Sequence, residues 1–152
     1  MSKLDSVPAH CKTPTKETKP KVEAHGRRAI FDNSSRAKIF KIDVDCWIRE
    51  TESLKADYIV VKPQVVDVVV ELKGSDIRHA IEQIVATSER WRNVSGSNGM
   101  IGGLVIFTHS PESSASLANK KKTLRDKNKI HLEVDKNGKT EYKFETFTGK
   151  KA

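Results

Sequence analysis

Apolar and polar residues alternate from Lys38 to Ile48, and this period of two predicts a strand with one apolar face. Two further apolar runs, Asp57 to Val61 and Val65 to Gly74, lie on either side of the break Lys62-Pro63-Gln64. Two β-branched runs around such a break predict a β-hairpin. The second run is nearly continuous in valine, which is typical of a central strand covered on both faces.

The period changes after the valine-rich run. Apolar residues recur three or four positions apart from Ile77 to Trp91, which predicts an amphipathic helix with Ser75 or Asp76 as its N-cap. A loop rich in Ser, Gly and Asn over residues 93–99 precedes another buried-strand run, Met100 to Thr108. These patterns add a helix and a strand to the three strands before them.

The last part of the chain predicts a short basic helix over about Ser114 to Asn128 and two strands, Ile130 to Val134 and Tyr142 to Phe147. The turn Asp135-Lys136-Asn137-Gly138 between these strands contains an Asn-Gly pair, which predicts a hairpin. The whole pattern is β-β-β-α-β-(α)-β-β. We therefore expect an α/β fold with a mixed central sheet flanked by helices, plus a C-terminal β-hairpin.

Charge is distributed unevenly along the 152 residues. Lys and Arg outnumber Asp and Glu by 28 to 20, and the net charge of +8 divides into +4 over residues 1–28, −2 over residues 29–118 and +6 over residues 119–152. Residues 1–28 hold too little apolar surface to offset the entropy of ordering, so we expect a flexible basic arm followed by a single domain over residues 29–152. The basic flanks favour nucleic acid as a partner. No apolar run approaches the about 20 residues of a membrane span, so we expect no membrane partner.

The sequence contains two cysteines, Cys11 and Cys46. Two cysteines cannot build a disulfide framework, and they lack the paired spacing of a zinc ribbon, so we expect a reducing compartment. The first 25 residues have no apolar segment typical of a secretory signal. These observations favour a cytoplasmic or nucleoid-associated protein that is not secreted.

Three ionisable residues, Asp57, Glu71 and Lys73, form the candidate chemistry. Glu71 and Lys73 are two apart on one strand and therefore share a face. If the hairpin folds about Gln64, residue n pairs with residue 128 − n, and Asp57 lies opposite Glu71 with Cβ atoms about 5 Å apart. Two carboxylates at that distance need a cation, and oxygen ligands suit Mg²⁺ or Mn²⁺. A lysine beside such a metal can position or deprotonate a water, which fits phosphodiester hydrolysis.

Asp57, followed fourteen residues later by the triplet Glu71-Leu72-Lys73 and then by a helix, resembles the PD-(D/E)XK nuclease superfamily. This is the fold of type II restriction endonucleases and archaeal Holliday junction resolvases, and the resemblance covers about residues 29–108. It implies a restriction-endonuclease-like αβββαβ core and Mg²⁺-dependent cleavage of nucleic acid. The resemblance also implies site roles: Asp57 and Glu71 as metal ligands, the Leu72 carbonyl as an additional ligand, Lys73 near the attacking water, and Gln83 as the helical glutamine.

The chain departs from the family pattern at two points. Ala56 replaces the proline of the family name, and the stretch from Arg27 to Arg36 offers only Asp32 as the acid expected from a first helix. Asp43 and Asp45 are alternative sources of a further metal ligand, and the sequence does not choose between them. A second interpretation of the triplet is an ordinary surface ion pair between Glu71 and Lys73.

A basic patch on the second predicted helix, formed by Lys120, Lys121, Lys122 and Arg125, is the candidate contact for a phosphate backbone. Together the patterns predict a Mg²⁺- or Mn²⁺-dependent endonuclease acting on DNA. A chain of this length is expected to need a homodimer or a partner protein for specificity. The alternative is a nucleic-acid- or protein-binding module that keeps the nuclease fold without catalysis.

Overall fold

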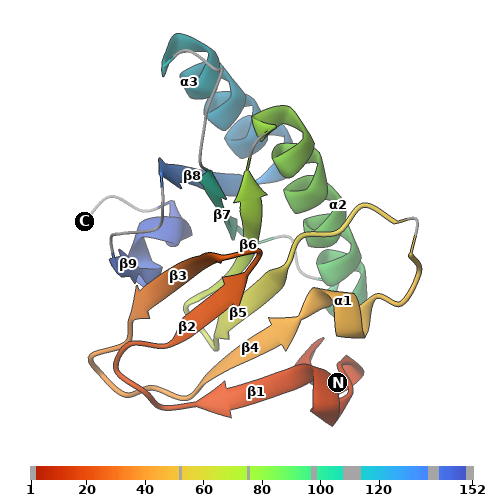
Figure 1. Cartoon of the computed structure of the whole chain (residues 1–152), viewed down its shortest axis with the longest axis vertical. Coiled ribbons are helices and arrows are strands. Elements are labelled where there is room, and N and C mark those ends of the chain that lie inside the picture. The colour runs from red at the N-terminus through yellow and green to blue at the C-terminus, as the bar shows by residue number, and fades with distance from the viewer. Residues whose placement is uncertain are drawn as a thin grey trace.

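Six strands form the central sheet of the protein, which a computed structural model describes over residues 3–51, 53–74, 76–96, 99–107, 114–136 and 141–149, without the side chains of Lys73, Ser95 and Ser114. The strands are β1 (Lys12–Thr15), β4 (Ile39–Asp43), β5 (Tyr58–Lys62), β6 (Val66–Gly74), β7 (Ile101–Phe107) and β8 (Ile130–Lys136), in the spatial order β1-β4-β5-β6-β7-β8. Neighbours are antiparallel from β1 to β6 and parallel from β6 to β8 (Figure 1). The expectation of an α/β fold with a mixed sheet is therefore confirmed.

A smaller sheet covers one face of the central sheet. It consists of β2 (Lys21–Ala24), β3 (Arg27–Asp32) and β9 (Glu141–Lys143), in the order β2-β3-β9. Its buried residues, with those of the 3₁₀ turn η4 (Phe144–Thr148), form one apolar cluster with Val68, Val70 and Leu72 of β6. Phe31 of β3 stacks on Phe144 of η4 with ring centroids 4.9 Å apart, and this aromatic pair belongs to the same cluster as the aliphatic residues of the central sheet.

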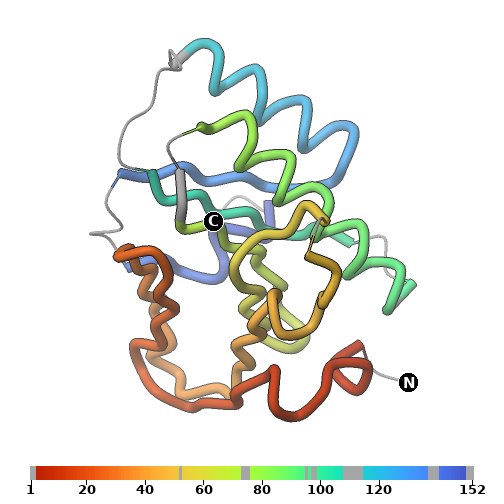
Figure 2. Tube along the Cα trace, turned by 45° about the vertical axis from the view of Figure 1, so that its right-hand side comes forward, coloured from red at the N-terminus to blue at the C-terminus, as the bar shows by residue number. Residues whose placement is uncertain are grey.

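Helices cover the opposite face (Figure 2). The long helix α2 (Ile77–Ser95) begins at Asp76, whose side chain accepts a hydrogen bond from the His79 N–H, and ends at Gly96 with φ of 69°. Alongside it lie α3 (Ser114–Thr123) and a π turn, η3 (Leu124–Asn128). None of the helices in the described ranges is long and apolar enough to cross a membrane.

Strand β6 lies between these two layers. Val69 packs with Ile84 and Trp91 of α2, whereas Val68 and Val70 pack against the smaller sheet. Alternate residues of a strand point to opposite faces, so a run of valines fills both apolar layers at once. The sequence expectation of a central strand covered on both faces is confirmed.

The structure differs from the expected flexible arm over residues 1–28. Between Lys3 and Arg28 the chain forms two 3₁₀ turns, η1 (Lys3–Ser6) and η2 (Ala9–Cys11), then strands β1 and β2 and the first residues of β3. Three of its few apolar side chains, Val7, Cys11 and Val22, are at most 4% exposed. Backbone pairing of β1 with β4 and of β2 with β3 adds contacts that composition does not reveal.

The predicted C-terminal hairpin is wrong for the described residues. Strand β8 pairs in parallel with β7 in the central sheet, and β9 pairs in parallel with β3 in the smaller sheet. The predicted strand Tyr142 to Phe147 is therefore a three-residue strand followed by the 3₁₀ turn η4. Asn137 and Gly138, on which the hairpin prediction rested, lie outside the described residues.

The first helix of the expected αβββαβ core also differs. In the described stretch from residue 3 to residue 38, which precedes β4, the helical elements are 3₁₀ turns and no α-helix occurs. The predicted strand Lys38 to Ile48 ends at Asp43, whose side chain accepts a hydrogen bond from the Cys46 N–H and caps the short helix α1 (Val44–Trp47). The local cap overrides the alternating pattern at this point.

A disulfide joins Cys11 to Cys46, with Cα atoms 5.4 Å apart. The bond connects the end of η2 to α1, across 35 positions of sequence. The expectation was that two cysteines cannot build a disulfide framework, and the structure shows this one bond between them. The expected reducing compartment and cytoplasmic location stay predictions.

Candidate functional site

The predicted pairing of the two carboxylate-bearing strands is confirmed. Tyr58 pairs with Val70 and Ile59 with Val69, so the residue numbers of each pair sum to 128. Continuing this register by one residue places Asp57 opposite Glu71, where β5 begins. The Asp57 N–H donates a 3.0 Å hydrogen bond to the Val70 carbonyl, which extends the strand contact to this position.

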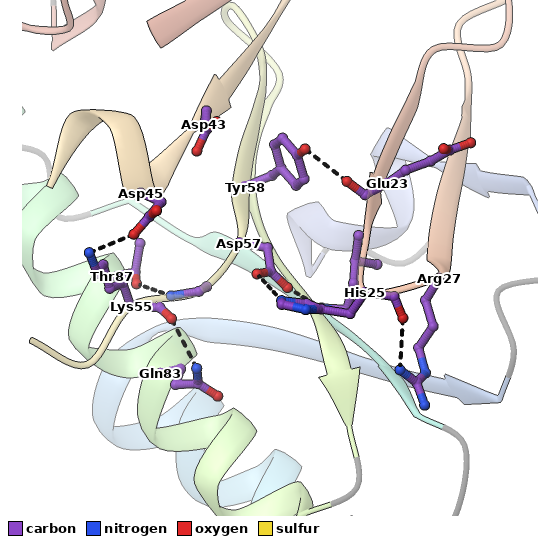
Figure 3. Close-up of polar contacts among 12 residues, drawn as sticks. Glu23, His25, Arg27, Asp43, Asp45, Lys55, Asp57, Tyr58, Gln83 and Thr87 are labelled. Carbon is purple, nitrogen blue, oxygen red and sulfur yellow. Dashed lines mark hydrogen bonds and ion pairs between the residues drawn. The ribbon is translucent and has the colours of Figure 1, made fainter. Parts of the chain in front are cut away.

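The Asp57 carboxylate contacts a backbone N–H of β6 and the side chain of a histidine. Its Oδ2 accepts a 2.8 Å hydrogen bond from the backbone N–H of Leu72, and its Oδ1 lies 3.3 Å from Nε2 of His25 (Figure 3). The Asp57 side chain is 19% exposed. The carboxylate is therefore oriented by the β6 backbone while part of it still reaches solvent.

Glu71 is the more buried acid, with 2% of its surface exposed. Its position two residues after Val69 places it on the face that carries α2. In the part of the chain that the structure describes, the one group of three or more acidic, histidine or cysteine ligand atoms within 4.8 Å of each other is His10, Cys11 and Cys46. Asp57 and His25, whose atoms lie 3.3 Å apart, therefore form no such group with Glu71 in the same ranges.

Two carboxylates fit Mg²⁺ better than they fit a metal that needs a full set of protein ligands. Mg²⁺ is commonly held by one or two carboxylates, with water and substrate phosphate oxygens in the remaining positions. The donors at this site are the hard oxygens of Asp57 and Glu71, one oriented by a backbone N–H and the other buried. The donor types of Asp57 and Glu71 are therefore those that Mg²⁺ or Mn²⁺ prefers, and metal binding by these two residues stays a prediction.

The rest of the triplet lies on β6. Leu72 is fully buried and belongs to the apolar cluster on the opposite face from α2, as strand alternation requires. The side chain of Lys73 lies outside the described residues, so its predicted place beside the carboxylates stays a prediction. The register between β6 and β7 shifts between Glu71 and Gly74, so the strand pairing is irregular at the triplet itself.

Helix α2 holds the segment that leads into Asp57. Nε2 of Gln83 donates a 3.0 Å hydrogen bond to the Lys55 carbonyl, and Oγ1 of Thr87 accepts a 2.8 Å bond from the Ala56 N–H (Figure 3). Gln83 and Thr87 are four positions apart and so share one helix face. The structure thus brings Gln83 to the site through the backbone of this segment, and its predicted catalytic role stays a prediction.

Asp43 and Asp45, the alternative sources of a further ligand, are both engaged elsewhere. Asp43 caps α1, and Asp45 forms a 2.7 Å ion pair with Nζ of Lys55. Asp43 also pairs with Tyr58, the residue that follows Asp57. Burial raises the pKa of Tyr58, and the charges of Asp43, Asp57 and Glu23 raise it further.

His25 is a residue of this site that sequence reasoning missed. It occupies the turn between β2 and β3 with φ of 55°, and the next residue, Gly26, has φ of 74°. Two successive residues with positive φ are typical of a tight type I′ hairpin turn, and His-Gly between the alternating residues Val22 and Ala29 was the available signal. The turn carries the imidazole to Asp57.

A cavity of about 680 Å³ lies beside this turn. Its lining includes Gly26, Arg27 and Arg28, and Arg27 donates a 3.3 Å hydrogen bond to the His25 carbonyl. Arg28 is exposed. The β2–β3 turn therefore places Arg27 beside His25, the residue that contacts Asp57, and the cavity next to it is lined by both arginines and by Glu23.

The basic patch predicted on the second helix is divided between two environments. Lys122 and Arg125 are exposed, whereas Lys120 and Lys121 are partly buried. Nζ of Lys120 donates a 3.0 Å hydrogen bond to Oγ of Ser116 and lines a cavity of about 550 Å³ between α2 and α3. Lys122 and Arg125 are thus the members most accessible to a phosphate backbone.

Comparisons of this chain with protein-family models, with curated proteins and with solved structures found no match.

Proposed function

We propose that this protein is a divalent-metal-dependent endonuclease that hydrolyses phosphodiester bonds in DNA. The observation that supports the proposal is the register of β5 and β6, in which Tyr58 pairs with Val70; continued by one residue, it would set Asp57 opposite Glu71 at one end of the two central strands. Two acids of this kind on adjacent strands, followed by a lysine and a helix, are the arrangement that the resemblance to PD-(D/E)XK nucleases requires. The order of β4, β5, β6, α2 and β7 agrees with the βββαβ part of that core.

Asp57 and Glu71 would hold Mg²⁺ or Mn²⁺, with the Leu72 carbonyl as an additional ligand. The bound metal would activate a water and stabilise negative charge on the phosphate. The Leu72 N–H orients the Asp57 carboxylate, and Gln83 and Thr87 fix the segment that precedes it. Lys73 is proposed to position the attacking water.

The substrate is proposed to be a nucleic acid because exposed cations are available for phosphate contacts, and DNA because of the resemblance to PD-(D/E)XK nucleases. Arg27 and Arg28 lie at the β2–β3 turn, and Lys122 and Arg125 are exposed at the end of α3 and on η3. Such residues supply sequence-independent affinity through the phosphate backbone. One such site cuts one strand, so cleavage of both strands requires a homodimer, a partner protein or two successive cuts.

A second candidate function is a nucleic-acid- or protein-binding module that keeps the fold without catalysis. The observation that favours it is that both oxygens of Asp57 already have partners, the Leu72 N–H and His25. A carboxylate with these two partners can have a purely structural role, which is to hold the β2–β3 turn against β6. The two functions differ in one result, metal-dependent cleavage.

The test is incubation of the full-length protein with plasmid, single-stranded DNA, four-way junctions and RNA, with Mg²⁺ or with EDTA. The proposal expects cleavage of a DNA substrate with Mg²⁺ that EDTA abolishes and that Glu71→Gln lacks. Binding without cleavage of every substrate would favour the non-catalytic module. Cleavage of RNA alone would overturn the assignment of DNA as the substrate.

A further inference from the structure

A second cluster of metal-ligating atoms lies outside the carboxylate site. One ligand atom each from His10, Cys11 and Cys46 lies within 4.8 Å of the other two. His10 and Cys11 end the 3₁₀ turn η2, and Cys46 belongs to α1. Three residues from two separate segments therefore meet at one point.

The disulfide between Cys11 and Cys46 accounts for two of these residues and leaves His10 unexplained. An imidazole makes no contribution to the S–S bond itself, yet this exposed histidine places a ring nitrogen beside both sulfurs. Two thiolates and one imidazole are a donor set that Zn²⁺ prefers, whereas Mg²⁺ avoids it. The presence of His10 thus points to a second state of the two cysteines.

We propose that reduction of the Cys11–Cys46 disulfide converts this cluster into a zinc site formed by His10, Cys11 and Cys46. In the reduction a dithiol gives two electrons and two protons to the disulfide, which becomes two thiols while the dithiol becomes a cyclic disulfide. Zn²⁺ then binds, the two cysteine thiols lose their protons to solvent, and the neutral imidazole supplies the third ligand. No metal changes its oxidation state.

The geometry suits both states. Cα atoms 5.4 Å apart permit a disulfide, for which about 4.4–6.8 Å is usual. Zn–S bonds of about 2.3 Å and Zn–N bonds of about 2.0–2.1 Å place tetrahedral ligand atoms about 3.3–3.8 Å apart. Ligand atoms that already lie within 4.8 Å of one another need only small side-chain movements to reach that separation.

A fourth ligand position is open to solvent. A cavity of about 400 Å³ is lined by His10 and Cys11 and continues to Thr13, Asp43 and Tyr58. Sites with three protein ligands commonly hold water in the fourth position. A polar cavity of this size has room for that water.

Zinc and the disulfide would have the same mechanical effect. Each links the end of η2, directly before β1, to α1, which directly follows β4. Strand β1 is an edge strand whose one neighbour in the central sheet is β4. The N-terminal segment would therefore stay linked to α1, through the disulfide under oxidising conditions and through zinc under reducing conditions.

The test compares oxidised and reduced full-length protein. The reduced protein, freed of dithiothreitol under anaerobic conditions, is titrated with Co²⁺ and then with Zn²⁺, and the metal content is measured by native mass spectrometry. We expect a thiolate-to-cobalt charge-transfer band, displacement by one Zn²⁺ per chain, and neither band nor stoichiometric zinc in the oxidised protein. A reduced protein without the band would overturn the proposal.

His10→Ala is the decisive variant, because His10 is exposed and outside the apolar core, so its replacement leaves the fold intact. We expect His10→Ala to weaken zinc binding about tenfold or more and Cys46→Ser to abolish it. His79→Ala, which removes an exposed histidine from α2, is the matched control and should bind zinc like the parent protein. Equal zinc affinity of His10→Ala and the parent would refute the assigned ligand set.

Discussion

Nε2 of His25 lies 3.3 Å from Oδ1 of Asp57, although the two residues belong to different sheets. His25 is in the turn of the smaller sheet, and Asp57 lies directly before β5 of the central sheet. The candidate site is therefore built where the two sheets meet, and the N-terminal segment contributes to it. Deletion of residues 1–25 would remove β1, β2 and His25, so it tests the fold as well as any phosphate contact.

Asp57→Asn separates the proposed metal ligand from the structural hydrogen bond. The amide oxygen can still accept the Leu72 N–H, so we expect the free energy of unfolding to change by about 1 kcal/mol or less. Loss of the charge should lower Mg²⁺-dependent cleavage by about 100-fold or more. Urea unfolding and plasmid nicking measure the two effects.

Asp57→Ala is the control for that substitution. It leaves the Leu72 N–H without its acceptor, so unfolding should become easier by about 1–3 kcal/mol, and cleavage should be lost as well. If Asp57→Asn cuts DNA at the parental rate, Asp57 is not a metal ligand.

Thr87→Val tests whether α2 positions the segment that precedes Asp57. The substitution keeps the side-chain shape but removes the acceptor of the buried Ala56 N–H, and it should cost about 1–3 kcal/mol of stability. Gln83→Ala, which removes the bond to the Lys55 carbonyl, should cost about 0.5–1.5 kcal/mol. Glu82→Gln, at an exposed position of the same helix, should leave stability unchanged. An unaltered unfolding midpoint in Thr87→Val would contradict this role of α2.

The hairpin register and the helix α2 could be predicted from the sequence because both depend on neighbouring residues. The short break at Lys62-Pro63-Gln64 limits the registers in which the two valine-rich strands can pair. The apolar residues from Ile77 to Trp91 fall on one face only if the segment is an α-helix. The Asp57–Glu71 relationship follows from the same local pairing. This is the part of the site that sequence reasoning could reach.

The rest depends on contacts between distant segments. Parallel pairing of β9 with β3 joins residues more than 100 positions apart, and no local pattern at Tyr142 announces it. Asp67 shows the same limit: it is buried and accepts a 2.7 Å hydrogen bond from Nε1 of Trp91, a residue of α2. Such partners become visible only when the chain is folded.

Salt dependence tests the DNA contacts of the exposed cations. Each phosphate contact adds about 0.9 to the slope of log K against log salt concentration. The double variant Lys122→Ala/Arg125→Ala should therefore reduce the slope by up to about 1.8 if both side chains touch phosphates. Lys16→Ala, at an exposed position before β2, is the control for loss of one positive charge elsewhere on the surface, and its slope should match that of the parent. Fluorescence anisotropy with a labelled duplex measures the slope, and parental behaviour of the double variant would exclude this surface.

Tyr142 makes the stability of the fold sensitive to alkaline pH. Its hydroxyl donates a 2.6 Å hydrogen bond to Oδ2 of Asp135 and so links β9 to β8. Burial raises the pKa of Tyr142, and the hydrogen bond and charge of Asp135 raise it further. The folded protein therefore holds the phenol proton at a pH where the unfolded chain, with a tyrosine pKa of about 10, has lost it.

The sign follows from proton linkage: stability from this group is complete below about pH 10 and declines as pH rises further, because the unfolded state then binds fewer protons. Tyr142→Phe should cost about 1–3 kcal/mol at pH 8 and should show a shallower loss of stability between about pH 10 and 11. Tyr58→Phe, at the other tyrosine of the chain, is the comparison, since the pKa of Tyr58 is raised as well. Urea unfolding at each pH gives the free energies, and parallel alkaline profiles for the parent and Tyr142→Phe would show that the Tyr142 proton is not held by the fold.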